Sequence, residues 1–299
     1  MLGVITGFAI ILSVIFIGWL LAARKVIKSD SERLMFNRVA FYAATPALLF
    51  NSVAKSDPGT VLSPVILVII AATAIVAAIY AAAFWRKGVA EVASGAAAAS
   101  YFNSVNIGLP VSIYVLGNST YAIPVVFIQM ALFTPLILGA LGGNSLLSGI
   151  KTGLLSPMVV ASFLGFIVAW QGWTIPEPVM APIELLGGAS IPMILMSFGA
   201  SLSTSGALSD KESRPQTLLA TSLKLIGMPI VAFLICLAAG LDEDTTYAAV
   251  ILAALPTAQQ VYNYAATFQR ATNVARDTVF ITTFASLPVM LVIALLFGR

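Results

Sequence analysis

The sequence contains no histidine and only one cysteine, Cys236, which lies inside an apolar run. A single cysteine cannot build a disulfide framework within the chain. Without histidine, zinc sites of the usual kind and histidine-based catalytic triads are excluded. Paired carboxylates inside the apolar runs and a P-loop are also missing, which argues against a hydrolase and against ATP as the energy source. We therefore expect a protein that is not an enzyme, with no metal or other cofactor and no nucleic-acid partner.

Charged residues are scarce as well, at 9% of the 299 residues, whereas 60% are hydrophobic. About a quarter of a typical soluble chain is charged. A transmembrane helix needs roughly 20 apolar residues, so the sequence predicts an all-α integral membrane protein in a lipid bilayer with ten transmembrane helices. The expected spans are Val4–Ala23, Leu34–Val53, Val61–Trp85, Val92–Leu116, Tyr121–Leu141, Thr152–Trp170, Ala181–Leu202, Thr217–Ala239, Tyr247–Phe268 and Val274–Phe297.

The basic residues alternate between the loops that these spans define. With the amino terminus outside, only Lys55 and Arg299 fall on the outer side. The inner side carries Arg24, Lys25, Lys28, Arg33, Arg38, Arg86, Lys87, Lys151, Lys211, Arg214, Lys224, Arg270 and Arg276. Inner loops of membrane proteins carry such an excess. The pattern predicts a multi-pass protein of the cell (inner) membrane with both termini outside, and it explains the net charge of +3.

Four prolines indicate an internal repeat. Pro46 and Pro110 are 64 residues apart, as are Pro192 and Pro256, and an offset of 146 maps the first pair onto the second. Chance coincidence among fifteen prolines is the alternative. Two halves of five spans, residues 1–146 and 147–299, must insert in opposite orientations because five is odd. Inverted repeats with helices interrupted at matching positions are typical of secondary transporters.

Polar side chains cluster beside the expected interruptions of the fourth and ninth spans. The expected helix-breaking positions are Gly108, Pro110 and Pro256, together with Pro46 and Pro192. The polar candidates are Asn103, Ser104, Asn106, Gln259, Gln260 and Asn263, with Gln129 isolated in the fifth span. They either hydrogen-bond between helices or line a substrate site. Helix ends exposed by such breaks hold a carboxylate without a buried cation.

Lys224 is the charge placed deepest in a predicted span, eight residues into the eighth. Its ammonium group either reaches back to the inner interface or faces the helix bundle, where it meets an anionic solute or takes part in gating.

Five segments in order resemble the auxin efflux carrier family in its compact bacterial form. They are Pro46–Phe50, the Asn103, Gly108 and Pro110 pattern, Ser156–Val159, Leu223–Pro229 and Ala254–Ala258. The resemblance implies the ten-helix inverted-repeat fold shared with bile-acid sodium symporters, with broken helices 4 and 9 that cross. It also implies a scaffold of helices 1, 2, 6 and 7 and a transport domain of helices 3–5 and 8–10. The family carries organic anions, including dicarboxylates in bacteria, and Asn103 with the span 9 amides corresponds to the substrate site.

These expectations describe a secondary carrier of a small organic anion, a carboxylate or dicarboxylate, that works by elevator-like alternating access. A carrier of a neutral or zwitterionic solute and a non-transporting membrane sensor or subunit remain the alternatives. The coupling ion stays open, because span 9 offers Gln259 and Gln260 where sodium symporters carry an acidic ligand. Assembly as a homodimer is also left open.

Overall fold

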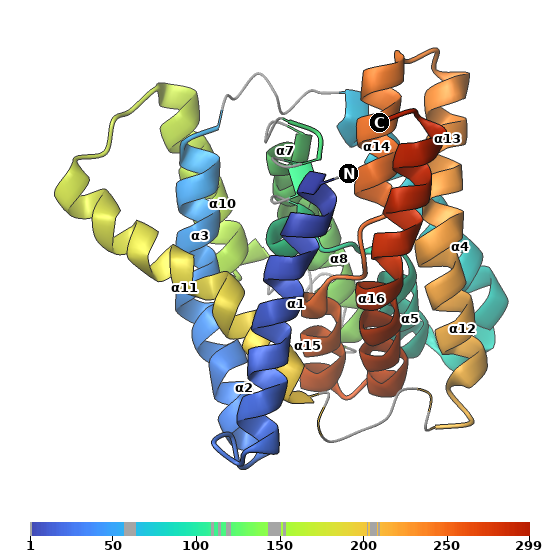
Figure 1. The fold of residues 1–299 in the computed structure, drawn as a ribbon, viewed down its shortest axis with the longest axis horizontal. Helices are drawn as coiled ribbons and strands as arrows, with labels where there is room; N and C mark the ends of the chain where they lie inside the picture. Colours follow the sequence, from blue (N-terminus) through green and yellow to red (C-terminus); the bar gives the residue numbers. More distant parts are fainter. Residues whose placement is uncertain are drawn as a thin grey trace. The chain divides into compact units, whose positions relative to one another are not determined.

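The structure, a computed structural model, describes residues 2–56, 64–108, 111–112, 115–117, 121–142, 151, 154–201, 203, 208 and 210–299. Throughout these residues the regular secondary structure is helical, apart from one isolated antiparallel bridge between Phe102 and Thr257 (Figure 1). The all-α class predicted from the sequence is therefore confirmed.

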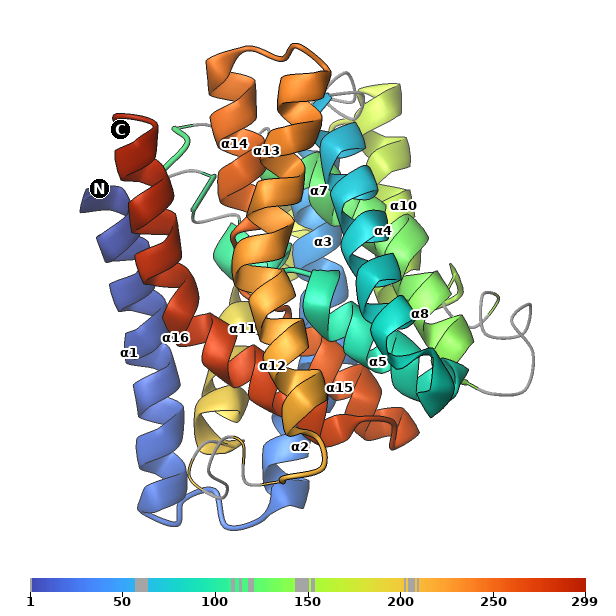
Figure 2. The same cartoon turned by 90° about the vertical axis from the view of Figure 1, so that its right-hand side faces the viewer.

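The chain packs as two compact units, and each takes segments from both predicted halves. The larger unit comprises Met1–Gly7, Leu62–Thr152 and Ala207–Arg299. Its helices are α4 (Pro64–Phe84), η3 (Trp85–Lys87), α5 (Val89–Ser100), η4 (Ser104–Gly108), α7 (Ala122–Ile128), η6 (Gln129–Phe133), α8 (Thr134–Leu141), α12 (Arg214–Ser222), η7 (Leu223–Gly227), α13 (Met228–Ala238), α14 (Glu243–Ala253), α15 (Gln259–Phe268) and α16 (Thr272–Leu296). Figure 2 shows α13 lying between α14 and α4, with which it packs.

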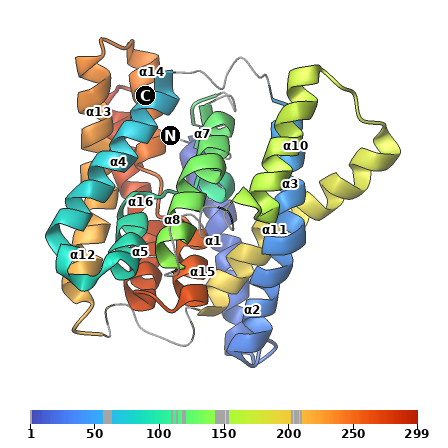
Figure 3. The same ribbon diagram turned by 180° about the vertical axis from the view of Figure 1, so that it is seen from behind.

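The smaller unit comprises Phe8–Val61 and Gly153–Gly206. Its helices are α1 (Leu2–Ala23, from Phe8 onward), α2 (Asp30–Val39), η1 (Ala40–Ala44), α3 (Thr45–Ala54), α10 (Pro157–Gln171) and α11 (Glu177–Ser201). Figure 3 shows α10 running beside α3. Gly165 permits this contact, since a Cβ there would lie 2.7 Å from the Phe50 carbonyl oxygen. A buried hydrogen bond of 2.7 Å between the Thr45 and Ser190 hydroxyls joins α3 to α11.

Within the described residues, four helical stretches are long and apolar enough to cross a membrane. They are Pro64–Lys87, Glu177–Ser197, Arg214–Ala238 and Thr272–Leu296. Each of the ten predicted spans overlaps a helix or a series of consecutive helices. That all ten cross the bilayer as an inverted repeat stays a prediction.

A turn of π-helix precedes three of the described prolines that lie in the predicted spans. The π turns η1, η6 and η7 are followed, two residues after their ends, by Pro46, Pro135 and Pro229. A proline ring clashes with the carbonyl four residues earlier and cannot donate to it. A π turn inserts one extra residue, and at η1 the N–H of Thr45 bonds to Ala40, five residues back. The helix thereby passes the proline without ending.

The prediction that Pro46 breaks a helix was therefore wrong, because helical structure is continuous from Asp30 to Ala54. It was also wrong for Pro192, which lies inside the 25-residue helix α11. A proline removes one backbone hydrogen bond, which a long membrane helix tolerates when neighbouring helices support it. Near Pro192 the neighbouring helix is α3, whose Leu48 backbone packs closely against Gly187 of α11.

Candidate functional site

Two helices of the larger unit end opposite each other, at Ser100 in α5 and at Ala253 in α14. The non-helical residues that follow, 101–103 and 254–258, pair through their backbones, and we call these two segments the crossing. Asn103 N–H donates to the Pro256 carbonyl at 2.8 Å, and Ala258 N–H donates to the Tyr101 carbonyl at 2.9 Å. Backbone groups freed at membrane depth need such internal partners. The two interruptions therefore stabilise each other.

Threonine side chains satisfy further backbone groups of the crossing. The Thr257 hydroxyl donates to the Ala98 carbonyl at 2.7 Å, one of the carbonyls left free at the end of α5. The Thr257 N–H in turn donates to the Thr282 hydroxyl of α16 at 3.0 Å. Thr257 and Thr282 are almost completely buried. These bonds connect α5, the crossing and α16.

Gln129 joins the crossing although it stands alone in the sequence. It begins the π turn η6 and is 1% exposed. Its amide nitrogen donates to the Phe102 carbonyl at 3.0 Å, and its amide oxygen accepts a hydrogen bond from the Ser104 hydroxyl. Ser104 itself begins the π turn η4. π turns often occur at functional sites, and here two of them direct polar side chains to one place.

The second interruption leads into α15, whose first two residues are Gln259 and Gln260. Both are buried, and the Gln260 amide oxygen has no hydrogen-bond partner among the described residues. The residue before the helix, Ala258, offers no side-chain cap to the first N–H groups. The start of α15 therefore presents a partial positive charge, as helix amino termini do. Asn263 lies one turn further along and is half-buried.

Lys224 lies in the π turn η7 and is fully buried. Its ammonium nitrogen donates to the Ala253 carbonyl at 2.6 Å. It also lies 5.4 Å from the centre of the Phe102 ring. The structure thus brings Lys224 to the crossing and away from any interface with solvent.

The remaining predicted residues are distributed as follows. Asn103 is 4% exposed, and the backbone of Asn106 belongs to η4, while its side chain lies outside the described residues. Gly108 ends η4, where a Cβ would lie 3.1 Å from a Leu255 methyl group. Pro110 lies outside the described residues. Pro46 and Pro192 belong to the smaller unit.

Sequence reasoning missed Phe102, Thr257 and Thr282. Thr257 directly follows the predicted break at Pro256, and Thr282 stands in a Thr-Thr pair within an apolar span. A broken helix requires hydroxyl or amide partners for its freed backbone groups. The positions of these two threonines in the sequence could therefore have indicated their role.

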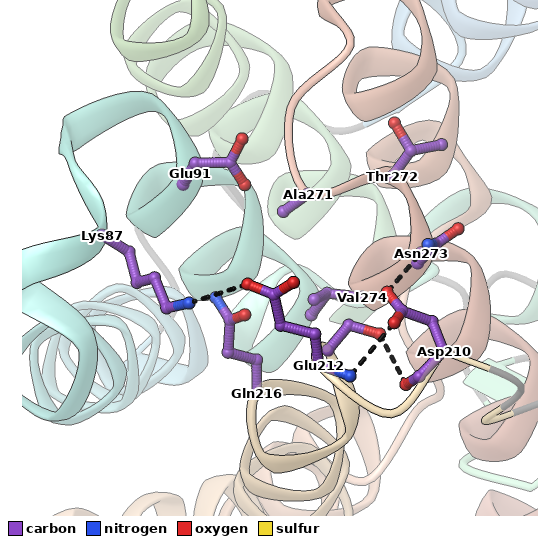
Figure 4. Close-up of a pocket in the computed structure, with 10 residues that line it drawn as sticks. Lys87, Glu91, Asp210, Glu212, Gln216, Ala271, Thr272, Asn273 and Val274 are labelled. Atoms are coloured by element: carbon purple, nitrogen blue, oxygen red, sulfur yellow. Dashed lines mark hydrogen bonds and ion pairs between the residues drawn. The ribbon is translucent and has the colours of Figure 1, made fainter.

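Two cavities lie elsewhere. One of about 330 Å³ in the larger unit is lined by charged residues of η3, α5 and the segment before α12, and by uncharged residues of α12 and the start of α16 (Figure 4). Lys87 and Glu212 are 3.6 Å apart there and both exposed, and such pairs contribute little to stability. The Asn273 amide donates to Asp210 and lowers the pKa of that exposed carboxyl. The other, about 610 Å³, lies in the smaller unit beside Lys25, Lys28 and Arg33. Exposed lysines line both cavities, Lys87 at the first and Lys25 and Lys28 at the second. The crossing instead holds several buried polar groups that are hydrogen-bonded to one another, so we take the crossing as the candidate site.

A family model described as "Membrane transport protein" matches residues 3–141 and 143–294. The chain belongs to this family. It is the auxin efflux carrier family that the five segments resembled, and that resemblance is confirmed. A relative from Rhizobium meliloti (strain 1021), named "Putative malonate transporter", is 29% identical over 94% of this chain and 92% of its own. "Uncharacterized transporter YfdV" from Escherichia coli (strain K12) is 26% identical over 83% of each chain.

Membership of this family, with its apolar helices, makes the protein a multi-pass membrane transporter with a small-molecule substrate. It is not an enzyme, as the sequence predicted.

Proposed function

We propose that the protein is a secondary carrier of a small organic anion, a carboxylate or dicarboxylate, bound at the crossing. The observation that carries the proposal is the paired interruption, where an uncapped amino terminus of α15 lies beside buried amides. Helix amino termini bind anions through free N–H groups and the helix dipole. Asn103, Gln259 and Gln260 add amide donors without introducing a negative charge. The name of the Rhizobium meliloti relative, "Putative malonate transporter", agrees with a dicarboxylate.

The two packing units support an elevator-like mechanism. The smaller unit contains predicted spans 2, 6 and 7 and most of span 1, and the larger unit contains spans 3–5 and 8–10. These are the sets that the family resemblance implies for scaffold and transport domains. The crossing lies wholly within the larger unit, so substrate and site would move together as that unit shifts. The ten-span inverted repeat, the inner-membrane location and the outer position of both termini belong to the same proposal.

Uptake into proteoliposomes tests this function. Purified protein is reconstituted, the vesicles are loaded with unlabelled malonate, and exchange for external radiolabelled malonate is followed. Other dicarboxylates and neutral or zwitterionic amino acids are added as competitors. We expect competition by dicarboxylates only. Competition by amino acids would favour a carrier of zwitterions, and the absence of exchange for every labelled solute would favour a sensor or subunit.

Two substitutions test the site. Asn103→Ala and Gln260→Ala should each lower exchange by about tenfold or more, since a lost buried hydrogen bond to a charged group has that effect. Asn273→Ala and Gln269→Ala are matched controls, because these amides are exposed and lie outside the crossing. Normal exchange by both crossing variants would show that the site assignment is wrong.

A further inference from the structure

The Lys224 side chain buries its amino group inside the larger unit, where it is 0% exposed. Removing an ammonium group from water is costly unless its N–H groups find acceptors. No carboxylate lies within ion-pair distance of it among the residues that the structure describes. The compensation must therefore come from uncharged groups.

Three such groups surround the ammonium nitrogen. The Ala253 carbonyl lies at 2.6 Å, the Met228 sulfur at 3.6 Å and the centre of the Phe102 ring at 5.4 Å. An ammonium group has three N–H donors, and an aromatic face attracts a cation at this distance. The ammonium group therefore has three partners within the chain and does not depend on a substrate carboxylate for compensation.

The place that Lys224 occupies is the carboxyl end of an interrupted helix. Ala253 is the last residue of α14, where free carbonyls carry partial negative charge. Phe102 bridges to Thr257 across the crossing. In membrane carriers with interrupted helices, such carboxyl ends and unwound carbonyls coordinate an exchangeable sodium ion or proton. Here an ammonium group on a side chain stands in the corresponding position.

We propose that Lys224 is a tethered cation that holds the crossing in place of an exchangeable metal ion, so that transport requires no sodium. This proposal rests on the carrier function proposed above. Lys224 acts through the Ala253 carbonyl and the Phe102 ring, and it is therefore a positioning residue. Its removal should leave a vacant cation site that a small cation from solution can fill.

The experiment compares wild-type protein with Lys224→Ala in proteoliposomes. Wild-type malonate exchange should be unchanged when choline replaces sodium. Lys224→Ala should lose exchange by about tenfold or more, as expected for a buried bond from a charged donor. Adding sodium or methylammonium chloride should raise malonate exchange by Lys224→Ala several-fold. Choline chloride should not, because choline has no N–H and is larger. Lys224→Met, which fills the space with a neutral chain, should be inactive and not rescued. Lys211→Ala, at an exposed lysine, is the matched control.

A second measurement needs neither substrate nor transport. Sodium or methylammonium should raise the thermal unfolding midpoint of purified Lys224→Ala and leave that of the wild type unchanged.

Sodium-dependent exchange by the wild type would overturn the proposal and leave the carrier function standing. Full activity of Lys224→Ala, or an inactive variant that no cation rescues or stabilises, would also overturn it. Failure of wild-type exchange alone would count against the carrier function, and the unfolding measurement would still decide the role of Lys224. If Lys224→Ala does not fold, the sodium dependence of exchange by the wild type decides whether the proposed role of Lys224 holds.

Discussion

Replacing Thr257 by valine removes one hydroxyl from the crossing while keeping the shape of the side chain. The backbone N–H of residue 257 keeps its hydrogen bond to the Thr282 hydroxyl. The Ala98 carbonyl, however, loses the hydrogen bond of 2.7 Å that it accepts from the Thr257 hydroxyl. An unpaired buried carbonyl costs about 1–3 kcal/mol, whereas hydrogen bonds between membrane helices average about 0.6 kcal/mol because other partners are found. The helix that would supply another donor to Ala98 has ended at Ser100. We therefore expect a loss of about 1–2 kcal/mol in the free energy of unfolding.

Equilibrium unfolding in mixed micelles with increasing SDS, followed by helical circular dichroism, measures this loss. Thr283→Val is the matched control, because Thr283 is also buried in the larger unit. Its hydroxyl donates to the Val279 carbonyl four residues back in the same helix. That carbonyl keeps its backbone donor, so we expect a change within about 0.5 kcal/mol. If the two variants are equally stable, the Thr257 hydroxyl does not support the end of α5 and the reasoning fails.

Two further predictions concern the smaller unit and the loop before α14. Gly187→Ala should destabilise the protein, because the new Cβ would lie 2.9 Å from backbone atoms of Leu48, whereas Gly188→Ala, with open space, should be neutral or stabilising by up to about 1 kcal/mol. Thermal midpoints of the purified variants measure both, and equal midpoints would contradict the close packing of α11 on α3. Hydrogen bonds from the Thr245 hydroxyl and N–H lower the pKa of the Asp242 carboxyl, so its contribution to stability is complete above the unfolded pKa of about 3.9. That contribution is lost as the pH falls through the lower folded pKa, and Asp242→Asn should flatten the pH dependence of the midpoint in this window. An identical pH profile for the wild type and Asp242→Asn would exclude this role.

Much of the fold follows from the sequence because the bilayer imposes a length and a composition on each helix. The scarcity of charge and the recurrence of apolar runs predicted an all-helical membrane protein, and the five family-like segments led to the correct family. The positions of the crossing amides were visible too, since Asn103, Gln259 and Gln260 lie within five residues of Gly108 or Pro256 in the predicted spans. A polar side chain inside a transmembrane span requires a structural or functional partner, and the residue type alone reveals this need.

Only the tertiary structure decided which partner each polar group has. Gln129 looked isolated, but folding brings it to Phe102, 27 residues away along the chain. Lys224 had two open alternatives, and the fold places it on the Ala253 carbonyl and the Phe102 ring. Pro46 and Pro256 look alike in sequence, yet one follows a π turn and the other lies in a true interruption. Hydrogen bonds across helices depend on packing between distant segments, and periodicity along one segment carries no record of that packing.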